Sequence, residues 1–301
     1  MATLKNRINT IVYDILNRLQ YPLLELLYCN KRMYTYCFCN KYFKITKRNN
    51  YGDDLNCYYL EKVFGKVLIK PEYSLFQHAK TYSFIGSILE YVCERNEPVI
   101  VWGTGFKFEK NNLSAREISK NTYLAVRGPL TREIILKSGG SCPAIYGDPG
   151  ILISRFIKVE RAIKYKYGVI PHKLDAASSV VIDLEKRNDV KVISISQYHS
   201  FESFIADLNS CEYILSSSLH GLIISDSYRI PNLWMKFSNK LDGGDFKFFD
   251  YYKGAKKQVN FYECQNGIID FDLVDQKLNC WEEAYIDPCF IKSCPVNLDL
   301  V

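Results

Sequence analysis

The sequence predicts an α/β protein with two doubly wound parallel sheets that face each other across a cleft. Short apolar runs alternate with helical patterns through most of the chain, which is typical of parallel sheets connected by helices. With 301 residues, the chain is long enough for two domains, each with a core of its own. The charged segment SRFIKVERAIKYKYG, from Ser154 to Gly168, separates two alternating series and indicates the bridge between the domains.

The first thirty residues predict a helix with one apolar face. Asp14, Asn17 and Arg18 keep every apolar run well short of the roughly 18 residues that a membrane-spanning helix needs. Two interpretations stay open: the helix packs on the domain, or its apolar face rests on a membrane surface. The apolar residues at helical spacing are Leu4, Ile8, Ile11, Val12, Ile15, Leu16 and Leu19.

The first alternating series extends from residue 34 to residue 148. Asp53 or Asp54 is expected to cap the helix that begins in NNYGDDLN, and Gly65 to end it. Gly128-Pro129 starts a later helix with proline at its favoured first position. The expected strands are YTYCFC (34–39), KVLIK (66–70), TYSFIG (81–86), PVIVWGTG (98–105), Tyr123 to Val126 and Ala144 to Tyr146; the other expected helices are 87–96 and 130–140.

The second series begins with a strand from Tyr167 to Ile170 and continues through VVIDLEKR, VKVISIS and a helix from Ser200 to Ser210. A strand from Glu212 to Leu215 then leads into three serines, Leu-His-Gly and a helix that Ile230-Pro231 brings to an end. In NKLDGGDFKFFDYY, Gly243-Gly244 demands a turn, and the aromatic residues are expected to pack over the cleft. The tail to Val301 is expected to pack back across the molecule.

Composition narrows the class of ligand. A hydrophobic content of 48% with 24% charged residues indicates an ordered globular chain. The net charge of +6 suits anionic small molecules or anionic lipid surfaces, whereas nucleic acid is disfavoured because no dense Lys/Arg run is interleaved with aromatic residues. Eleven irregularly spaced cysteines without a CxxC pair indicate a reduced intracellular protein and predict no metal site.

Function in such sheets collects beyond the carboxyl ends of the strands, where both series place polar residues. A helix N-terminus that follows hydroxyls can receive phosphate, an arginine can fork onto a carboxylate, and carboxylates can bind sugar hydroxyls. A small phosphorylated carboxylic acid and a polyol would satisfy that set. The same sequence would also be found if the aspartates only cap helices, the arginine is structural and the histidine belongs to the core. The residues are Asp53, Gly103, Arg127 and Asp148 from the first series, and His172, Lys173, Ser216, Ser217, Ser218 and His220 from the second.

Six motifs in order give a more specific indication. They are GDDLN, VWGTGF, RGPLTREI, YGDPGILI, VIPHK and SSSLHGLIISDSYRIP. Together they resemble the polysaccharide pyruvyl transferase family over roughly Asn50 to Trp234, and weakly around Asp250.

The resemblance implies a GT-B-like fold of two Rossmann-type domains. The first, residues 1–158 with the amphipathic helix at 1–30, would hold the acceptor; the second, residues 159–301, would hold phosphoenolpyruvate. The implied reaction moves the enolpyruvyl group onto two hydroxyls of a hexose and releases phosphate. The implied product is a 4,6-ketal of galactose in a bacterial capsule, another surface polysaccharide or its polyprenyl-diphosphate precursor. Phosphoenolpyruvate is a co-substrate, and no further cofactor is implied.

The resemblance also suggests roles for single residues. His220 is the expected acid/base, Arg127 the clamp on the donor carboxylate or phosphate, and Asp53 the group that orients or deprotonates the acceptor. Many relatives have arginine where this chain has Ser218, and Lys173 is expected to supply the missing charge. Donor contacts are further expected from Ser217, Leu219 and His172, and acceptor contacts from Asp54 and Asn56. Asp148 is expected to be a helix cap or hinge residue.

Two other functions fit the same fold: a nucleotide-sugar glycosyltransferase, and a glycan-binding relative without activity. Substitution of His220 by Ala or Arg127 by Met is expected to abolish turnover with little change in the melting curve. A cytoplasmic protein is expected, in peripheral contact with the inner face of the plasma membrane through its first helix.

Overall fold

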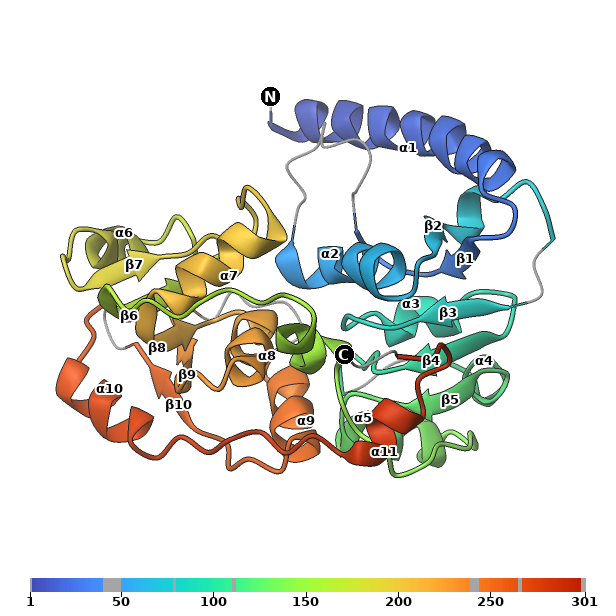
Figure 1. Ribbon diagram of the computed structural model, residues 1–301. Coiled ribbons are helices and arrows are strands. Elements are labelled where there is room, and N and C mark those ends of the chain that lie inside the picture. The colour runs from blue at the N-terminus through green and yellow to red at the C-terminus, as the bar shows by residue number, and fades with distance from the viewer. Residues whose placement is uncertain are drawn as a thin grey trace.

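The computed structural model describes residues 2–39, 50–77, 80–109, 112–238, 244–264 and 267–298, and it contains two parallel five-stranded sheets. The strand orders are β2-β1-β3-β4-β5 and β10-β9-β8-β6-β7, and every strand pair is parallel. Numbered within its own domain, each sheet has the order 2-1-3-4-5 of doubly wound folds. The α/β class and the two parallel sheets are therefore confirmed, in an arrangement consistent with two Rossmann-like domains (Figure 1).

The first sheet and its helices precede residue 156. Its elements are α1 (Ala2–Leu27), β1 (Arg32–Thr35), α2 (Tyr51–Tyr58), the π-helical turn η1 (Tyr59–Val63), β2 (Val67–Ile69), the 3₁₀ turn η2 (Pro71–Tyr73), β3 (Thr81–Ser83), α3 (Leu89–Cys93), β4 (Val99–Trp102), α4 (Ala115–Ser119), β5 (Thr122–Ala125), α5 (Pro129–Lys137) and the 3₁₀ helix η3 (Pro149–Arg155).

The second sheet and its helices follow. They are β6 (Tyr165–Ile170), α6 (Ser179–Glu185), β7 (Val190–Val192), α7 (Phe201–Asn209), β8 (Cys211–Ser216), α8 (Leu219–Ser227), β9 (Asn232–Lys236), α9 (Phe246–Gly254), β10 (Phe261–Glu263), α10 (Phe271–Leu278) and α11 (Pro288–Lys292).

Three local expectations are corrected. Asn50, one residue before α2, caps this helix by accepting a hydrogen bond from Gly52 N at 3.1 Å, so Asp53 and Asp54 lie in its first turn instead. The segment 144–146 forms only a single bridge, between Tyr146 and Val126, because no longer run of residues pairs there. The apolar run after Pro231 forms β9, an interior strand that was not among the expected strands.

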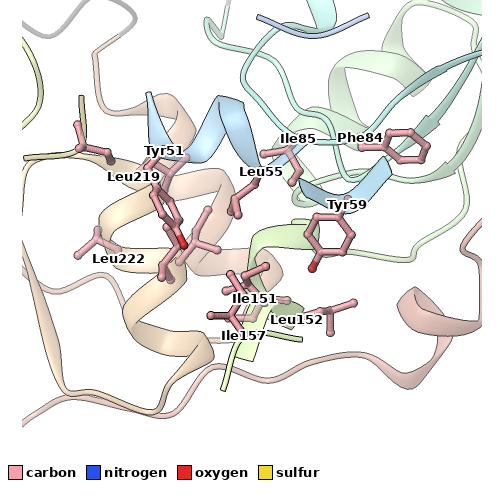
Figure 2. Close-up of a cluster of buried hydrophobic side chains, with 14 of the residues drawn as sticks. Tyr51, Leu55, Tyr59, Phe84, Ile85, Ile151, Leu152, Ile157, Leu219 and Leu222 are labelled. Carbon is pink, nitrogen blue, oxygen red and sulfur yellow. The ribbon is translucent and has the colours of Figure 1, made fainter. Parts of the chain in front are cut away.

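One hydrophobic cluster joins the two domains beneath the ends of their sheets. Figure 2 shows Leu55 of α2, Ile151 of η3 and Leu222 of α8 in this cluster, all of them buried. Elements of both domains therefore share a continuous core, which fixes α2 relative to α8. Other members drawn are Tyr51, Tyr59, Phe84, Ile85, Leu152, Ile157 and Leu219.

The two ends of the chain both pack on the first domain. The helix α1 lies along β2 and η2 (Figure 1). At the other end, the Phe290 ring of α11 stacks on Trp102 with 4.6 Å between ring centroids, and Trp102 Nε1 donates to Phe290 O at 3.0 Å. Within the described ranges, no helix is both long and apolar enough to cross a membrane.

Candidate active site

The candidate site lies where the N-termini of α2 and α8 meet, one from each domain. A Cβ atom on Gly52 of α2 would overlap Cγ and Nδ1 of His220, which stands in the first turn of α8. Only glycine allows this approach. Glycine of the GDDLN motif and histidine of the SSSLHG motif are thus in direct contact, although 168 positions separate Gly52 from His220 (220 − 52 = 168).

His220 is a buried, neutral imidazole. Its Nε2 is buried without a hydrogen-bond partner among the described residues, and it lies 4.0 Å from Asp148 Oδ2. Burial, followed by the positive charges of Lys247 and Arg127, lowers the pKa of His220 to about 3. The ring therefore carries no charge at neutral pH.

Asp148 is the N-cap of η3, as expected, and Asp148 Oδ1 accepts a hydrogen bond from Gly150 N at 2.9 Å. Its side chain is also the nearest acid to His220 Nε2. Burial raises the pKa of Asp148 to about 6, against the opposing effects of the Gly150 N–H group and the Arg127 charge. The sequence motif indicated the cap but not the proximity to the imidazole.

Asp53 projects from the first turn of α2 as a partly buried carboxyl group. Burial and the neighbouring charge of Asp54 raise the pKa of Asp53 to about 7, while Lys173 and Lys247 act in the opposite direction. This carboxyl group makes no hydrogen bond within the described part of the chain. The Asp53 carboxyl can therefore gain or lose a proton near neutral pH.

Asn56 positions the helix that carries Asp53. Its Nδ2 donates to Asp53 O at 2.9 Å and to Ile85 O at 3.1 Å, and its Oδ1 accepts from Ile85 N at 3.1 Å. The side chain is fully buried, and these bonds tie α2 to the carboxyl end of β3. Asn56 thus acts on the site through the backbone of α2.

The three serines before α8 differ in their surroundings. Ser216 Oγ donates to Ile170 O at 2.9 Å, and Ser217 Oγ donates to Asp175 Oδ2 at 2.7 Å. Ser218 is the N-cap residue of α8, yet its side chain makes no capping hydrogen bond. The Ser217 hydroxyl, which was predicted to contact the donor, is therefore hydrogen-bonded within the protein. Ser218, in contrast, stands at the N-terminus of α8. Leu219 is buried in the shared core.

His172 follows β6, the strand next to β8. Its backbone N–H donates to Ser217 Oγ at 2.8 Å, and its Nδ1 accepts from Leu174 N at 3.3 Å. That bond leaves the proton of the neutral ring on Nε2. Burial and the charges of Lys247 and Lys173 lower the pKa of His172 to about 4.

Two lysines supply the positive charge of the site. Lys173 is exposed, and its charge lowers the pKa of Asp53 and of His172. Lys247, a buried residue of α9, acts on Asp53, His172 and His220 alike. No sequence pattern indicated Lys247, because a single lysine in an aromatic helix is normally on the solvent-exposed face.

The comparison with known families agrees with this geometry. A model of the family described as polysaccharide pyruvyl transferase matches residues 50–239, the stretch that contains Gly52, Asp53, Asp148, His172 and His220. The chain belongs to this family. A protein of Acanthamoeba polyphaga mimivirus that is described as uncharacterized is 31% identical over 209 residues, which cover 67% of this chain and 69% of that protein. No solved structure matches.

In this member of the polysaccharide pyruvyl transferase family, the arginine of the RGP motif lies in the protein interior. The Arg127 side chain is 1% exposed. Its Nε donates to Asp250 Oδ2 at 3.0 Å, one terminal nitrogen to Ser87 Oγ at 2.6 Å, and the other to Phe106 O at 2.5 Å. Arg127 thus reaches the site through its charge, which lowers the pKa values of His220 and Asp148.

The predicted acceptor residue Asp54 points toward the second domain. Asp54 Oδ2 accepts a hydrogen bond from the Tyr198 hydroxyl at 2.5 Å. Both residues line an open cavity of about 430 Å³ between α2 and α7. Its wall combines aromatic rings with carboxylates: Tyr58, Tyr198 and Phe201 beside Asp54, Glu61 and Glu202.

No group of three or more His, Cys, Asp or Glu placed to hold a metal ion occurs in the described ranges.

Proposed function

We propose that the protein transfers the enolpyruvyl group of phosphoenolpyruvate to two hydroxyls of a hexose and releases phosphate. One observation carries the proposal: a carboxyl group with a pKa of about 7, on Asp53, stands at the junction where Gly52 contacts a neutral imidazole, that of His220. A group that can donate a proton and a neutral imidazole at one junction are what this transfer requires.

The donor is placed at the N-terminus of α8. The first N–H groups of a helix have no intrahelical partner and favour an anion, and the hydroxyl of Ser218 stands at this end. Lys173 and Lys247 provide the charge that relatives with arginine at the position of Ser218 obtain from a guanidinium. A trianionic donor that carries both a phosphate and a carboxylate fits two separate cations.

The proton steps follow from the protonation states. Asp53 gives its proton to the methylene carbon of the donor, which makes C2 electrophilic, and the first sugar hydroxyl adds there. His220 takes the proton of that hydroxyl. Phosphate departs, and the second hydroxyl closes the ketal. The methylene gains one proton, the two hydroxyls lose one each, and the leaving phosphate carries the other away.

Donor binding tunes both groups in the required direction. The positive charges that lower the pKa of His220 include Lys247, and an anion beside this lysine offsets its charge. The pKa of His220 then rises toward the range in which an imidazole is an effective base. The same anion raises the pKa of Asp53 and keeps its proton in place. Asp148 Oδ2, 4.0 Å from His220 Nε2, would stabilise the imidazolium that forms when the ring takes the proton of the first sugar hydroxyl.

The acceptor is placed in the cavity beside Asp54. Aromatic faces suit the apolar faces of sugar rings, and carboxylates accept hydrogen bonds from sugar hydroxyls. The cavity of about 430 Å³ lies within the size range of small-molecule sites. Galactose, with a 4,6-ketal as product, is the first acceptor to test, both free and in a polyprenyl-diphosphate-linked glycan of a surface polysaccharide.

The test is direct. The purified protein is incubated with phosphoenolpyruvate and a panel of galactose-containing acceptors, while phosphate release and the acceptor mass are measured. The proposal expects stoichiometric phosphate and ketal, lost in Asp53→Asn and His220→Ala but retained in the surface control Asp183→Asn. Turnover of a nucleotide sugar without phosphoenolpyruvate would instead establish a glycosyltransferase. Acceptor binding without either turnover would leave a glycan-binding protein.

A further inference from the structure

The N-terminal helix α1 packs on the first domain with a mostly polar face, from which the Tyr21 ring also reaches the core. Glu25 is fully buried, and its carboxylate accepts hydrogen bonds from the Tyr34 hydroxyl at 2.8 Å, Ser74 Oγ at 2.6 Å and Leu75 N at 2.7 Å. Asn17, two turns earlier, is 2% exposed. Although burial acts to raise it, the pKa of Glu25 is lowered by these bonds, so the carboxylate is charged and held.

Several apolar residues of α1 lie exposed on the other side of the helix. Leu19 is 66% exposed and Leu23 is 56% exposed. We call this surface the apolar ridge, and it consists of Ile11, Ile15, Leu19, Leu23, Leu26, Leu27 and Tyr28.

This orientation leaves more of the apolar surface of α1 exposed than is usual for a surface helix. A helix that only covers a domain turns its apolar stripe inward and its polar face to water. Exposure of a continuous aliphatic surface is unfavourable in water, and contiguous apolar patches on soluble proteins mark sites of interaction. The polar anchoring by Glu25 means that the ridge cannot be buried by simply rotating the helix, because rotation would break three hydrogen bonds.

The charge near the apolar ridge indicates which kind of surface the ridge binds. Residues 1–32 contain five basic residues, Lys5, Arg7, Arg18, Lys31 and Arg32, and two acidic residues, Asp14 and Glu25. Glu25 faces inward, and Asp14 pairs with Arg18 at 2.7 Å. Lys31 and Arg32, which follow α1, therefore leave the C-terminal end of the ridge positive, which favours an anionic lipid surface. A second copy of this chain would instead bring like charges together across the symmetric contact.

We propose that the apolar ridge docks the protein on an anionic membrane, with α1 parallel to the lipid surface and its aliphatic side chains among the acyl chains. The polar face then remains bonded to the domain, so docking requires no rearrangement of the fold. This inference goes beyond the proposed reaction and does not rest on it, since it concerns binding alone.

Flotation with vesicles tests the proposal on the full chain. The vesicles are composed of phosphatidylglycerol and phosphatidylcholine in equal parts, or of phosphatidylcholine alone. The ridge variant is Leu19→Asp/Leu23→Asp. Its matched control, Ile182→Asp/Leu273→Asp, introduces the same charges at exposed apolar positions of α6 and α10 in the second domain. The uncharged ridge variant Leu19→Gln/Leu23→Gln separates loss of apolar contact from added repulsion.

The wild-type chain and the control are expected to float with the anionic vesicles, and more weakly as salt is raised. Each leucine removed from the ridge should weaken partitioning about tenfold, so both ridge variants should remain at the bottom with unchanged melting curves. Equal flotation of the ridge variants and the wild type would overturn the proposal. Absence of flotation of the wild type would do so as well, as would a concentration-dependent dimer that the ridge variants dissolve.

Discussion

Asp53→Asn is expected to make the protein more stable at alkaline pH while it removes activity. The pKa of Asp53 is raised from 3.8 to about 7, so the folded state holds this proton more tightly than the unfolded state does. The stability associated with the protonated carboxyl is complete below about pH 4. It is lost as pH rises from about 4 to about 7, because the charge must then form in a partly buried site. Asparagine cannot ionise and avoids this loss.

The magnitude follows from the size of the shift. A change of about three pKa units corresponds to about 4 kcal/mol at full ionisation. Since the Asp53 carboxyl is partly exposed, solvent screens its neighbours, and a discounted gain of about 1–3 kcal/mol at pH 8 is more realistic. At pH 5 the folded carboxyl keeps its proton, and the gain should fall to about 1 kcal/mol or less.

Thermal and urea unfolding at pH 5 and pH 8 measure this difference, with phosphate release as the activity assay. Asp183→Asn, an exposed residue of α6 paired with Lys186, is the control and should change stability by less than about 0.5 kcal/mol at both pH values. Loss of the proton carrier should lower turnover by about 10²–10⁴-fold. A gain that is absent at pH 8, or that is equal at both pH values, would refute the electrostatic reasoning.

Three further substitutions probe the rest of the site. Gly52→Ala should displace the His220 ring by about 1 Å and lower kcat/KM about 100-fold in donor titrations; unchanged kinetics would contradict the contact. Arg127→Met leaves the Asp250 carboxylate buried without its cation, and should cost about 3–5 kcal/mol in urea unfolding, contrary to the small effect expected from sequence. Lys247→Ala should raise the KM for phosphoenolpyruvate and move the alkaline limb of the pH–rate profile upward, because this lysine lowers the pKa of Asp53, which must be protonated to act; a limb that stays in place would show that the charge of Lys247 does not reach the site.

The alternation of apolar runs and helical patterns was sufficient to predict both parallel sheets, because parallel strands are short, apolar and connected by helices. It failed where the local signal was ambiguous. NLWMK is a short run of five residues after the helix-ending Ile230-Pro231 that was not predicted as a strand, yet it forms β9. Ala144 to Tyr146 has strand-forming residues, yet only one bridge forms. Strand pairing depends on the partner, which a local pattern does not contain.

The site was predicted in part for a similar reason. Asp53 and His220 belong to motifs, and strand-end placement brings them to one junction. Their protonation states, however, arise from burial and from charges on other elements. The pKa of Asp53 depends on Lys247, a residue of α9 nearly 200 positions away in the chain (247 − 53 = 194). Such long-range effects require the fold, as does the ion pair that places Arg127 in the interior.

The glycines of the motifs explain why so much of the family resemblance reflects assembly rather than chemistry. A Cβ on Gly128 of the RGP motif would overlap the backbone of Asp250, and one on Gly254 would lie 2.5 Å from Arg127 O. With Gly52 against His220, these close approaches join α2, α5, α8 and α9 at the junction between the domains. A chain can therefore retain the motifs in order to keep its domains together even if the reaction is lost. For this reason the decisive measurements are those that distinguish loss of the Asp53 proton carrier from disruption of the close contacts around it.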